Sequence, residues 1–337
     1  MLNSRIDPVA EDLIARLLQH PSEQVRLEAL RLISNRDIVN IKEDLEEMLR
    51  SEASPDVKEQ AVKTICKIAD HDWELASYID HQDESVRNAA LTGMLGNAET
   101  SIKKIAEEKL GGLLQSNVER DKLAAISILT EVKDDYDHPE HARLVDDSNP
   151  DIRELAMKGI GKAYQDETLL ALFRHVSTQE KQVIAAIYNA GEKALPLLSE
   201  RIIADKMPET LTQKLIILFG KIGGENAKQL LLELLKKQPK HTAVIIKSLH
   251  RCKYVVEENH VKLFEALARQ YIIYGVELMN MQQALSKRET QYDVLDSSLH
   301  QEIQEIREIL LCLFGCMYDR EKMNQVKYGL NTSHKES

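Results

Sequence analysis

Apolar and polar positions repeat in one fixed pattern along the first half of the chain. Five segments align without gaps, each with a basic residue near its start, then an alanine and a large apolar residue four positions apart. An apolar residue directly precedes the basic one in four copies, and Asp121 takes its place in the fourth copy. Intervals of four place these apolar side chains on one helix face, so each segment is predicted to be an amphipathic helix. The aligned copies are residues 22–33, 54–65, 83–94, 118–129 and 149–160.

Each copy follows a shorter apolar segment, which predicts pairs of helices joined by a polar turn. Four copies begin with a residue that caps helix starts: Ser22, Ser54, Asp83 and Asn149. The prolines that follow Ser54 and Asn149 suit a first helical position because they lack an N–H group. A self-similar unit of about 30 residues is typical of helix-pair solenoids. The first helices of the pairs are predicted at residues 11–20, 41–51, 73–80, 102–115 and 141–146.

The pattern weakens after residue 160, but it still predicts three further pairs and then two longer helices. Residues 1–253 are therefore predicted to form about eight pairs, stacked as a right-handed α-solenoid of antiparallel helix pairs within an all-α fold. Residues 254–320 are predicted to cap or extend this array, and residues 321–337 to be the start of a truncated repeat or a flexible tail. The later helices are predicted at 167–175, 179–189, 193–204, 209–222, 227–237, 241–251, 259–287 and 298–318, with a helix stop at Gly220 and Gly223–Gly224.

The two long helices each carry a predicted apolar face. On the helix at 259–287 this face comprises Leu263, Leu267, Tyr271, Tyr274 and Leu278. On the helix at 298–318 it comprises Ile303, Ile306, Leu310, Leu313 and Met317.

Composition and charge narrow the class of protein. The formal net charge of −11 argues against a nucleic-acid groove, which needs clustered Lys and Arg. Neither a membrane span nor the apolar core of a signal peptide is evident, so we expect no membrane insertion and a cytoplasmic location. The four cysteines suit free, buried thiols in a reducing compartment.

The basic residues of the five copies form a ladder, because equivalent positions in a solenoid lie along one surface. This basic ladder could bind a ligand. We interpret it instead as a structural device, in which the ladder pairs with carboxylates of the preceding turns between neighbouring repeats. The ladder comprises Arg26, Lys58, Arg87, Lys122 and Arg153, and the expected partners are Glu23, Asp56, Glu84 and Asp151.

Four other features were weighed as chemical sites and assigned to structure. The acidic loop at 134–141 carries two histidines, but Pro139 interrupts them and no calcium-loop glycine is present. Cys312 and Cys316 share an apolar helix face, the glycines at 220–224 lack phosphate-loop spacing, and Trp73 fits a packing role. No catalytic, cofactor-binding or metal-binding residue is therefore assigned, and no cofactor is expected.

The sequences at 55–58, 85–90 and 150–156 resemble the short HEAT repeats of bacterial proteins. Residues 301–319 also resemble the segment that closes the HEAT region of bacterial proteins joining an ATP/ADP-translocase-like membrane domain to HEAT repeats and a cyclic-nucleotide-binding domain. This second resemblance implies that the chain is the middle part of a longer protein.

Three functions follow as hypotheses. The leading one is a non-enzymatic scaffold that binds a protein partner or a neighbouring domain of the same polypeptide. A regulatory linker between a transporter-like membrane domain and a cyclic-nucleotide-binding domain is the alternative. A HEAT-like lyase or DNA-repair enzyme is the third, although an acidic chain with one tryptophan supplies little for DNA.

Overall fold

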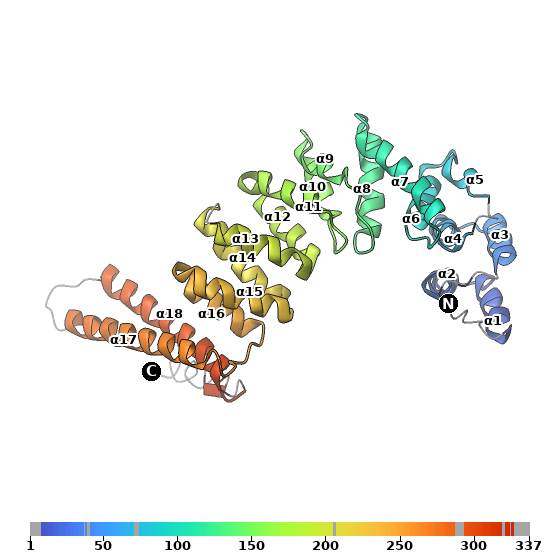
Figure 1. Cartoon of the computed structure of the whole chain (residues 1–337). Coiled ribbons are helices and arrows are strands. Elements are labelled where there is room, and N and C mark those ends of the chain that lie inside the picture. Colours follow the sequence, from blue (N-terminus) through green and yellow to red (C-terminus); the bar gives the residue numbers. More distant parts are fainter. Residues whose placement is uncertain are drawn as a thin grey trace. The chain divides into compact units, whose positions relative to one another are not determined.

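The described part of the chain consists of helices and their connections, without a β-strand (Figure 1). The computed structural model describes residues 8–36, 38, 41–70, 74–204, 207–286, 293–318, 321–323 and 325–326. The predicted all-α class is confirmed. The chain divides into two compact units, residues 1–190 and 191–337, so the boundary expected at residues 253 and 254 falls inside the second unit.

The first unit contains six successive helix pairs. The second helix of each pair packs against the second helix of the next, from α2 through α4, α6, α8 and α10 to α12. Figure 1 shows this succession from blue to green. The first helices are α1 (Pro8–Leu18), α3 (Lys42–Ser51), α5 (Ala76–Ile79), α7 (Thr100–Gln115), α9 (His141–Val145) and α11 (Asp166–Leu172). The second helices are α2 (Glu23–Arg36), α4 (Pro55–Ile68), α6 (Glu84–Leu95), α8 (Glu119–Val132), α10 (Pro150–Lys158) and α12 (Val176–Ala190).

The predicted start signals act at three of the patterned helices. The Ser54 hydroxyl accepts a hydrogen bond from the Val57 N–H, and the Asp83 carboxylate accepts one from the Ser85 N–H. The Asn149 side chain does the same for the Asp151 N–H. Each bond satisfies a backbone donor that the first helical turn leaves without a partner.

The alanine positions and the large apolar positions of the pattern are all buried. The buried positions are Ala29, Ala61, Ala90, Ala125 and Ala156, with Ile33, Ile65, Met94, Leu129 and Ile160. Close approach of α4 and α6 also depends on Gly93, where a Cβ atom would lie only 2.3 Å from the Lys63 carbonyl oxygen.

Some first helices differ in length from the prediction. Helix α5 has only four residues, and Trp73 lies outside the described residues.

A 3-10 turn, Phe173–His175, leads from α11 into α12. Helix α12 is kinked at Gln179 (φ −134°, ψ 42°), the residue where the sequence placed the start of the second helix of this pair.

The second unit begins with four helices and ends with two long ones. Helix α13 packs on α15, α14 on α16, and α16 on α18, which also packs along α17. The helices are α13 (Leu195–Ile203), α14 (Glu209–Ile222), α15 (Gly224–Lys237), α16 (Thr242–Arg251), α17 (Val261–Ser286) and α18 (Asp293–Met317), with short 3-10 helices at Gly191–Ala194 and Pro239–His241.

The glycine stop predicted after α14 needs one correction. Gly223 ends the helix with φ +73°, a backbone conformation that glycine adopts without steric cost. Gly220, in contrast, lies inside α14, where an added Cβ atom would be 2.9 Å from the Ser248 Cα of α16. Gly220 therefore permits close helix packing and does not end the helix.

The predicted faces of the long helices are confirmed in part: of the ten predicted residues, three are buried, six are half-buried and one is exposed. Leu278 of α17 and Ile306 and Leu313 of α18 are buried, whereas Tyr274 is 42% exposed. The connection into α17 is fixed to α18 by the Val256 N–H, which donates to the Cys316 carbonyl oxygen at 2.8 Å.

Candidate functional site

The turn before each patterned helix has the same hydrogen bond in all five copies. Two residues before the copy begins, a side chain accepts a bond from the backbone N–H two positions later, at 2.8 to 3.1 Å. We call these residues the turn acceptors: His20, Glu52, His81, Ser116 and Asp147. The bond orients the turn, and its acceptor position is visible in the sequence once the copies are aligned.

The arginines of the basic ladder bind the same turns. Nη1 of Arg26, Arg87 and Arg153 donates in each case to the two backbone carbonyls five and six residues earlier, at 2.5 to 3.1 Å. Part of the ladder thus holds the turn of its own repeat, a role that the sequence did not predict.

The predicted acidic partners of the ladder are wrong. Arg26 forms a two-pronged ion pair with Glu52, and Lys122 pairs with Asp147. Both carboxylates are turn acceptors of the following repeat. Arg153 donates instead to the Gln179 side chain of the following repeat at 2.9 Å. The ladder side chains run along the turns, so they meet the next turn and not the acids at the helix starts.

The pKa values of Glu52 and Asp147 reflect this pairing at the junctions, the places where one copy of the pattern meets the next. Burial alone would raise the pKa of Glu52, but the hydrogen bonds from Arg26 and from the Ser54 N–H outweigh burial and lower that pKa. The pKa of Asp147 is lowered in the same way, against its burial, by Lys122 and the Asn149 N–H. Both carboxylates therefore stabilise the folded chain as anions.

The junction of the third and fourth copies departs from this scheme. Its turn acceptor is Ser116, so the following turn offers Arg87 no carboxylate. At the same junction Asp121 replaces the apolar residue of the pattern, and its carboxylate accepts a hydrogen bond from the Ser116 hydroxyl at 2.6 Å. Among the described residues, no carboxylate lies within ion-pair distance of Arg87.

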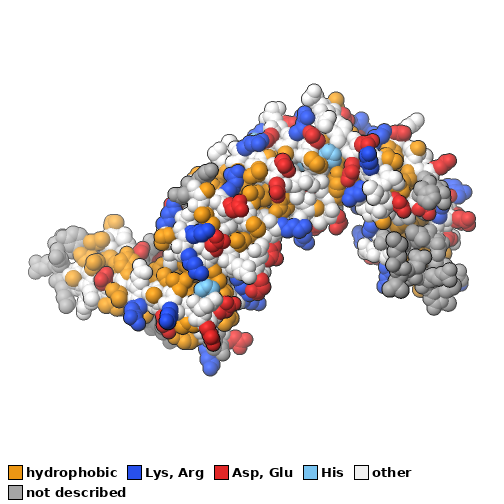
Figure 2. Space-filling model, in the orientation of Figure 1, with side chains coloured by type: hydrophobic (Ala, Val, Ile, Leu, Met, Phe, Trp, Pro, Cys, Tyr) orange, Lys and Arg blue, Asp and Glu red, His pale blue; other side chains and the backbone are white. Residues whose placement is uncertain are grey.

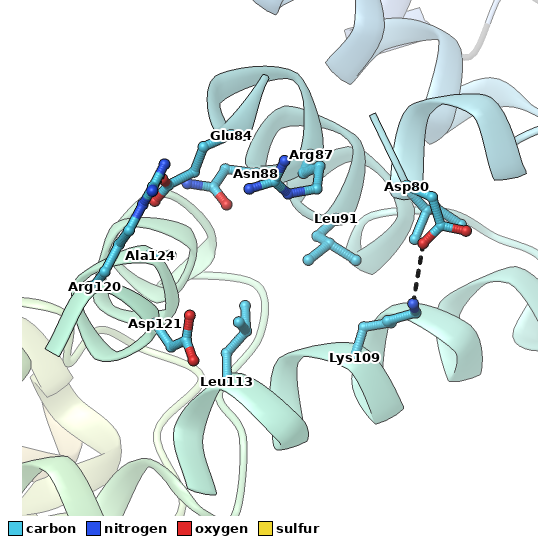
Figure 3. Close-up of a pocket in the computed structure, with 11 residues that line it drawn as sticks. Asp80, Glu84, Arg87, Asn88, Leu91, Lys109, Leu113, Arg120, Asp121 and Ala124 are labelled. Carbon is cyan, nitrogen blue, oxygen red and sulfur yellow. Dashed lines mark hydrogen bonds and ion pairs between the residues drawn. The ribbon is translucent and has the colours of Figure 1, made fainter. Parts of the chain in front are cut away.

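A cavity of about 220 Å³ lies at this junction. Figure 3 shows Arg87 and Asn88 of α6 facing it from one side and Asp121 and Leu113 from the other. Two ion pairs lie at its edge. Lys109 pairs with Asp80 at 3.2 Å, and Arg120 pairs with Glu84. The lining residues are Ile79, Asp80, Glu84, Arg87, Asn88, Leu91, Lys109, Leu113, Arg120, Asp121 and Ala124.

The cavity therefore presents a positive charge on one helix and a negative charge on another. Its two boundary ion pairs neutralise two acids and two bases, leaving Arg87 on α6 and Asp121 on α8 as the charges available to a ligand. Leu91, Leu113 and Ala124 add aliphatic surface. The sequence assigned no binding residue here, although Asp121 in an apolar column was a visible signal.

The acidic loop at 134–141 forms internal contacts. Asp137 and His141 are buried, with 2.6 Å between Oδ1 and Nδ1, and His141 Nε2 lies 3.0 Å from the Ala156 carbonyl oxygen. Asp137 also accepts from the His138 and Gln165 N–H groups at 2.9 Å. The described residues contain no group of three or more His, Cys, Asp or Glu side chains arranged to hold a metal ion.

All four cysteines are free and buried, as predicted. Burial raises the pKa of the Cys66 thiol to about 12 and raises that of Cys252. A buried thiol with a raised pKa is a poor nucleophile, so these two thiols fit packing roles.

Two further surfaces have a cavity or an exposed apolar row. A cavity of about 190 Å³ lies between α10 and α12, where Gln182 already bonds Glu154 of α10. Hydrophobic side chains also gather over α17 and α18 (Figure 2), and on α17 they form an exposed row. The row comprises Ile272, Ile273, Val276 and Met279.

Neither surface is lined by an arginine of the basic ladder, as the cavity at α6, α7 and α8 is. No family model matches this sequence. No curated protein matches it either. Within the described ranges, no helix has the length and apolar character that crossing a membrane requires.

Proposed function

We propose that this chain is a non-enzymatic scaffold that binds a segment of another protein, or of a neighbouring domain, at the cavity between α6, α7 and α8. The observation that carries the proposal is the interrupted ladder. The junctions at Arg26 and Lys122 are each closed by an ion pair within the chain, whereas the junction at Arg87 leaves a guanidinium group facing a cavity. Surface that the repeat does not need for its own packing is suited to recognition.

The character of the lining supports binding over acid–base catalysis. Asp80 and Glu84 are held in ion pairs with Lys109 and Arg120, and the lining contains neither histidine nor cysteine. Aliphatic side chains with a few convergent polar groups are typical of ligand-binding cavities.

We further propose that the first unit is a right-handed α-solenoid of HEAT-like repeats. The succession of contacts from α2 to α12 and the recurring turn acceptors support this. In such an array each repeat contacts only its neighbours, so stability is close to a sum of local terms. Deleting residues 1–40 should then lower the urea midpoint while leaving the remaining residues helical by circular dichroism. A complete loss of helix would refute the array.

Site-specific photo-crosslinking tests the scaffold. A photoreactive amino acid at Arg120, whose side chain is 73% exposed at the rim, should give one dominant protein adduct in the native cell. The matched position is Leu32 on α2, which is 36% exposed and does not line the cavity. The purified adduct partner should bind the full chain reversibly. Equal labelling from both positions, or no protein adduct from Arg120, would refute the proposed function.

A further inference from the structure

We infer that the cavity takes an acidic side chain, glutamate or aspartate, from an extended protein segment. Arg87 forms the ion pair with its carboxylate, and Asp121 accepts a hydrogen bond from a backbone N–H of the same segment. This inference rests on the proposed scaffold function and names the chemistry of its partner.

Internal comparison of the repeats identifies the ligand chemistry. At the first junction the ladder arginine binds a carboxylate with Nε and Nη2 while Nη1 holds the turn carbonyls. Arg87 uses Nη1 for the equivalent carbonyls, at 2.5 and 2.8 Å. Its Nε and Nη2 groups, which have the geometry for a two-pronged carboxylate, have no hydrogen-bond partner among the described residues.

The fourth junction gives a second instance of the same preference. There Lys122 pairs with Asp147, again a carboxylate that belongs to the following turn. At the third junction Ser116 is too short and uncharged to play this part, and its hydroxyl is committed to the Val118 N–H and to Asp121. A carboxylate from outside the chain would complete the contact that the first and fourth junctions complete from within.

The opposite wall explains why the ligand is part of a peptide and not a bare anion. Asp121 faces the cavity with only one of its oxygens hydrogen-bonded, and it would repel an anion that brought no donor. A backbone N–H next to the acidic side chain supplies that donor. The Asn88 side chain, beside Arg87, can bond a backbone carbonyl or the carboxylate.

The volume limits the ligand to about one side chain. A cavity of about 220 Å³ is smaller than the roughly 300 to 1,000 Å³ of typical small-molecule sites. Leu91 and Leu113 provide an aliphatic surface for the methylene groups of a glutamate.

Peptide-observed NMR with the full chain tests the inference. The probe is the blocked tripeptide acetyl-Ala-Glu-Ala-amide, compared with its Gln counterpart and with free acetate. The Glu peptide should bind saturably, and the Gln peptide should bind at least about tenfold more weakly, because hydrogen bonds to a charged group contribute about 1.5 kcal/mol or more. Acetate should also bind more weakly than the Glu peptide, because it brings no donor for Asp121.

Three variants assign the binding to the cavity. Arg87→Gln should weaken the Glu peptide at least about tenfold. Asp121→Val restores the apolar residue of the repeat and removes the acceptor of the backbone N–H, so the Glu peptide should bind no more tightly than acetate, while the urea midpoint should rise. Arg26→Gln is the matched control, because it removes the same contacts to turn carbonyls at a junction that Glu52 already closes.

Equal affinity for the Glu and Gln peptides, or equal effects of Arg87→Gln and Arg26→Gln, would overturn the inference. Acetate binding as tightly as the Glu peptide would overturn the protein segment as the source of the carboxylate. If the partner captured at Arg120 still binds the Arg87→Gln chain at full affinity, this inference fails while the scaffold stands. If no partner is captured, the scaffold fails whatever the peptides do.

Discussion

Replacement of Gly93 by alanine tests the packing of the first unit at its tightest described point between α4 and α6. A Cβ atom at position 93 would lie 2.3 Å from the Lys63 carbonyl oxygen and 2.9 Å from the Cys66 Cβ, where an ordinary contact begins at 3.4 Å. The nearest atom belongs to the backbone of α4, so it cannot rotate away as a flexible side chain would. The helices would have to separate by about 1 Å.

The net effect follows from two opposing contributions. Overpacking of this kind costs up to about 3 kcal/mol, and the upper value applies because backbone must move. Alanine is favoured over glycine inside a helix by about 1 kcal/mol. Gly93→Ala should therefore lower the free energy of unfolding by about 2 kcal/mol.

Gly112 supplies the matched control. It lies inside α7 and is exposed, and an added Cβ atom would meet nothing within 4 Å. Gly112→Ala should therefore raise stability by up to about 1 kcal/mol, through helix propensity alone.

Urea unfolding followed by circular dichroism at 222 nm measures both variants against the parent chain. The midpoint should fall for Gly93→Ala and rise for Gly112→Ala, with similar helix content at zero urea. A Gly93→Ala midpoint equal to or above the parent value would show that α4 and α6 do not approach as closely as the structure places them, and the reasoning would fail.

Three further predictions concern ionisable groups. Because the folded pKa of Glu52 is lowered, its stabilisation is complete above the ordinary carboxyl pKa and is lost as the pH falls through that value to the lowered one. Urea midpoints measured across the acid range should therefore fall less steeply in Glu52→Gln than in the parent; parallel curves would contradict the pairing with Arg26. Asp137→Ala removes the carboxylate that contacts Nδ1 of buried His141 and should cost about 1 to 3 kcal/mol in urea unfolding; an unchanged midpoint would show that the pair contributes little. Cys66, buried and with its pKa raised to about 12, should react with iodoacetamide at pH 8 only as fast as the first unit opens; labelling as fast as a free thiol would refute its burial.

Much of the fold follows from local sequence. The 3- and 4-residue spacing of apolar positions located the patterned helices, and Ser54, Asp83 and Asn149 marked their starts, because a cap acts on backbone groups within three residues. Short helices such as α5 were located less well, since four residues hold too little periodicity to define their ends. The two unequal roles of Gly220 and Gly223 also needed the structure, because a close helix contact and a helix stop both select glycine.

The sequence by itself determined that the chain is helical, which residues form the buried column of each repeat, and that Asp121 departs from that column. Only the tertiary structure decided that Arg26 pairs with Glu52, that Lys122 pairs with Asp147, and that Arg87 is left facing a cavity. The physical reason is distance along the chain. Helix periodicity and capping act within a few residues, whereas an ion pair between residues 26 positions apart depends on how one repeat is stacked on the next.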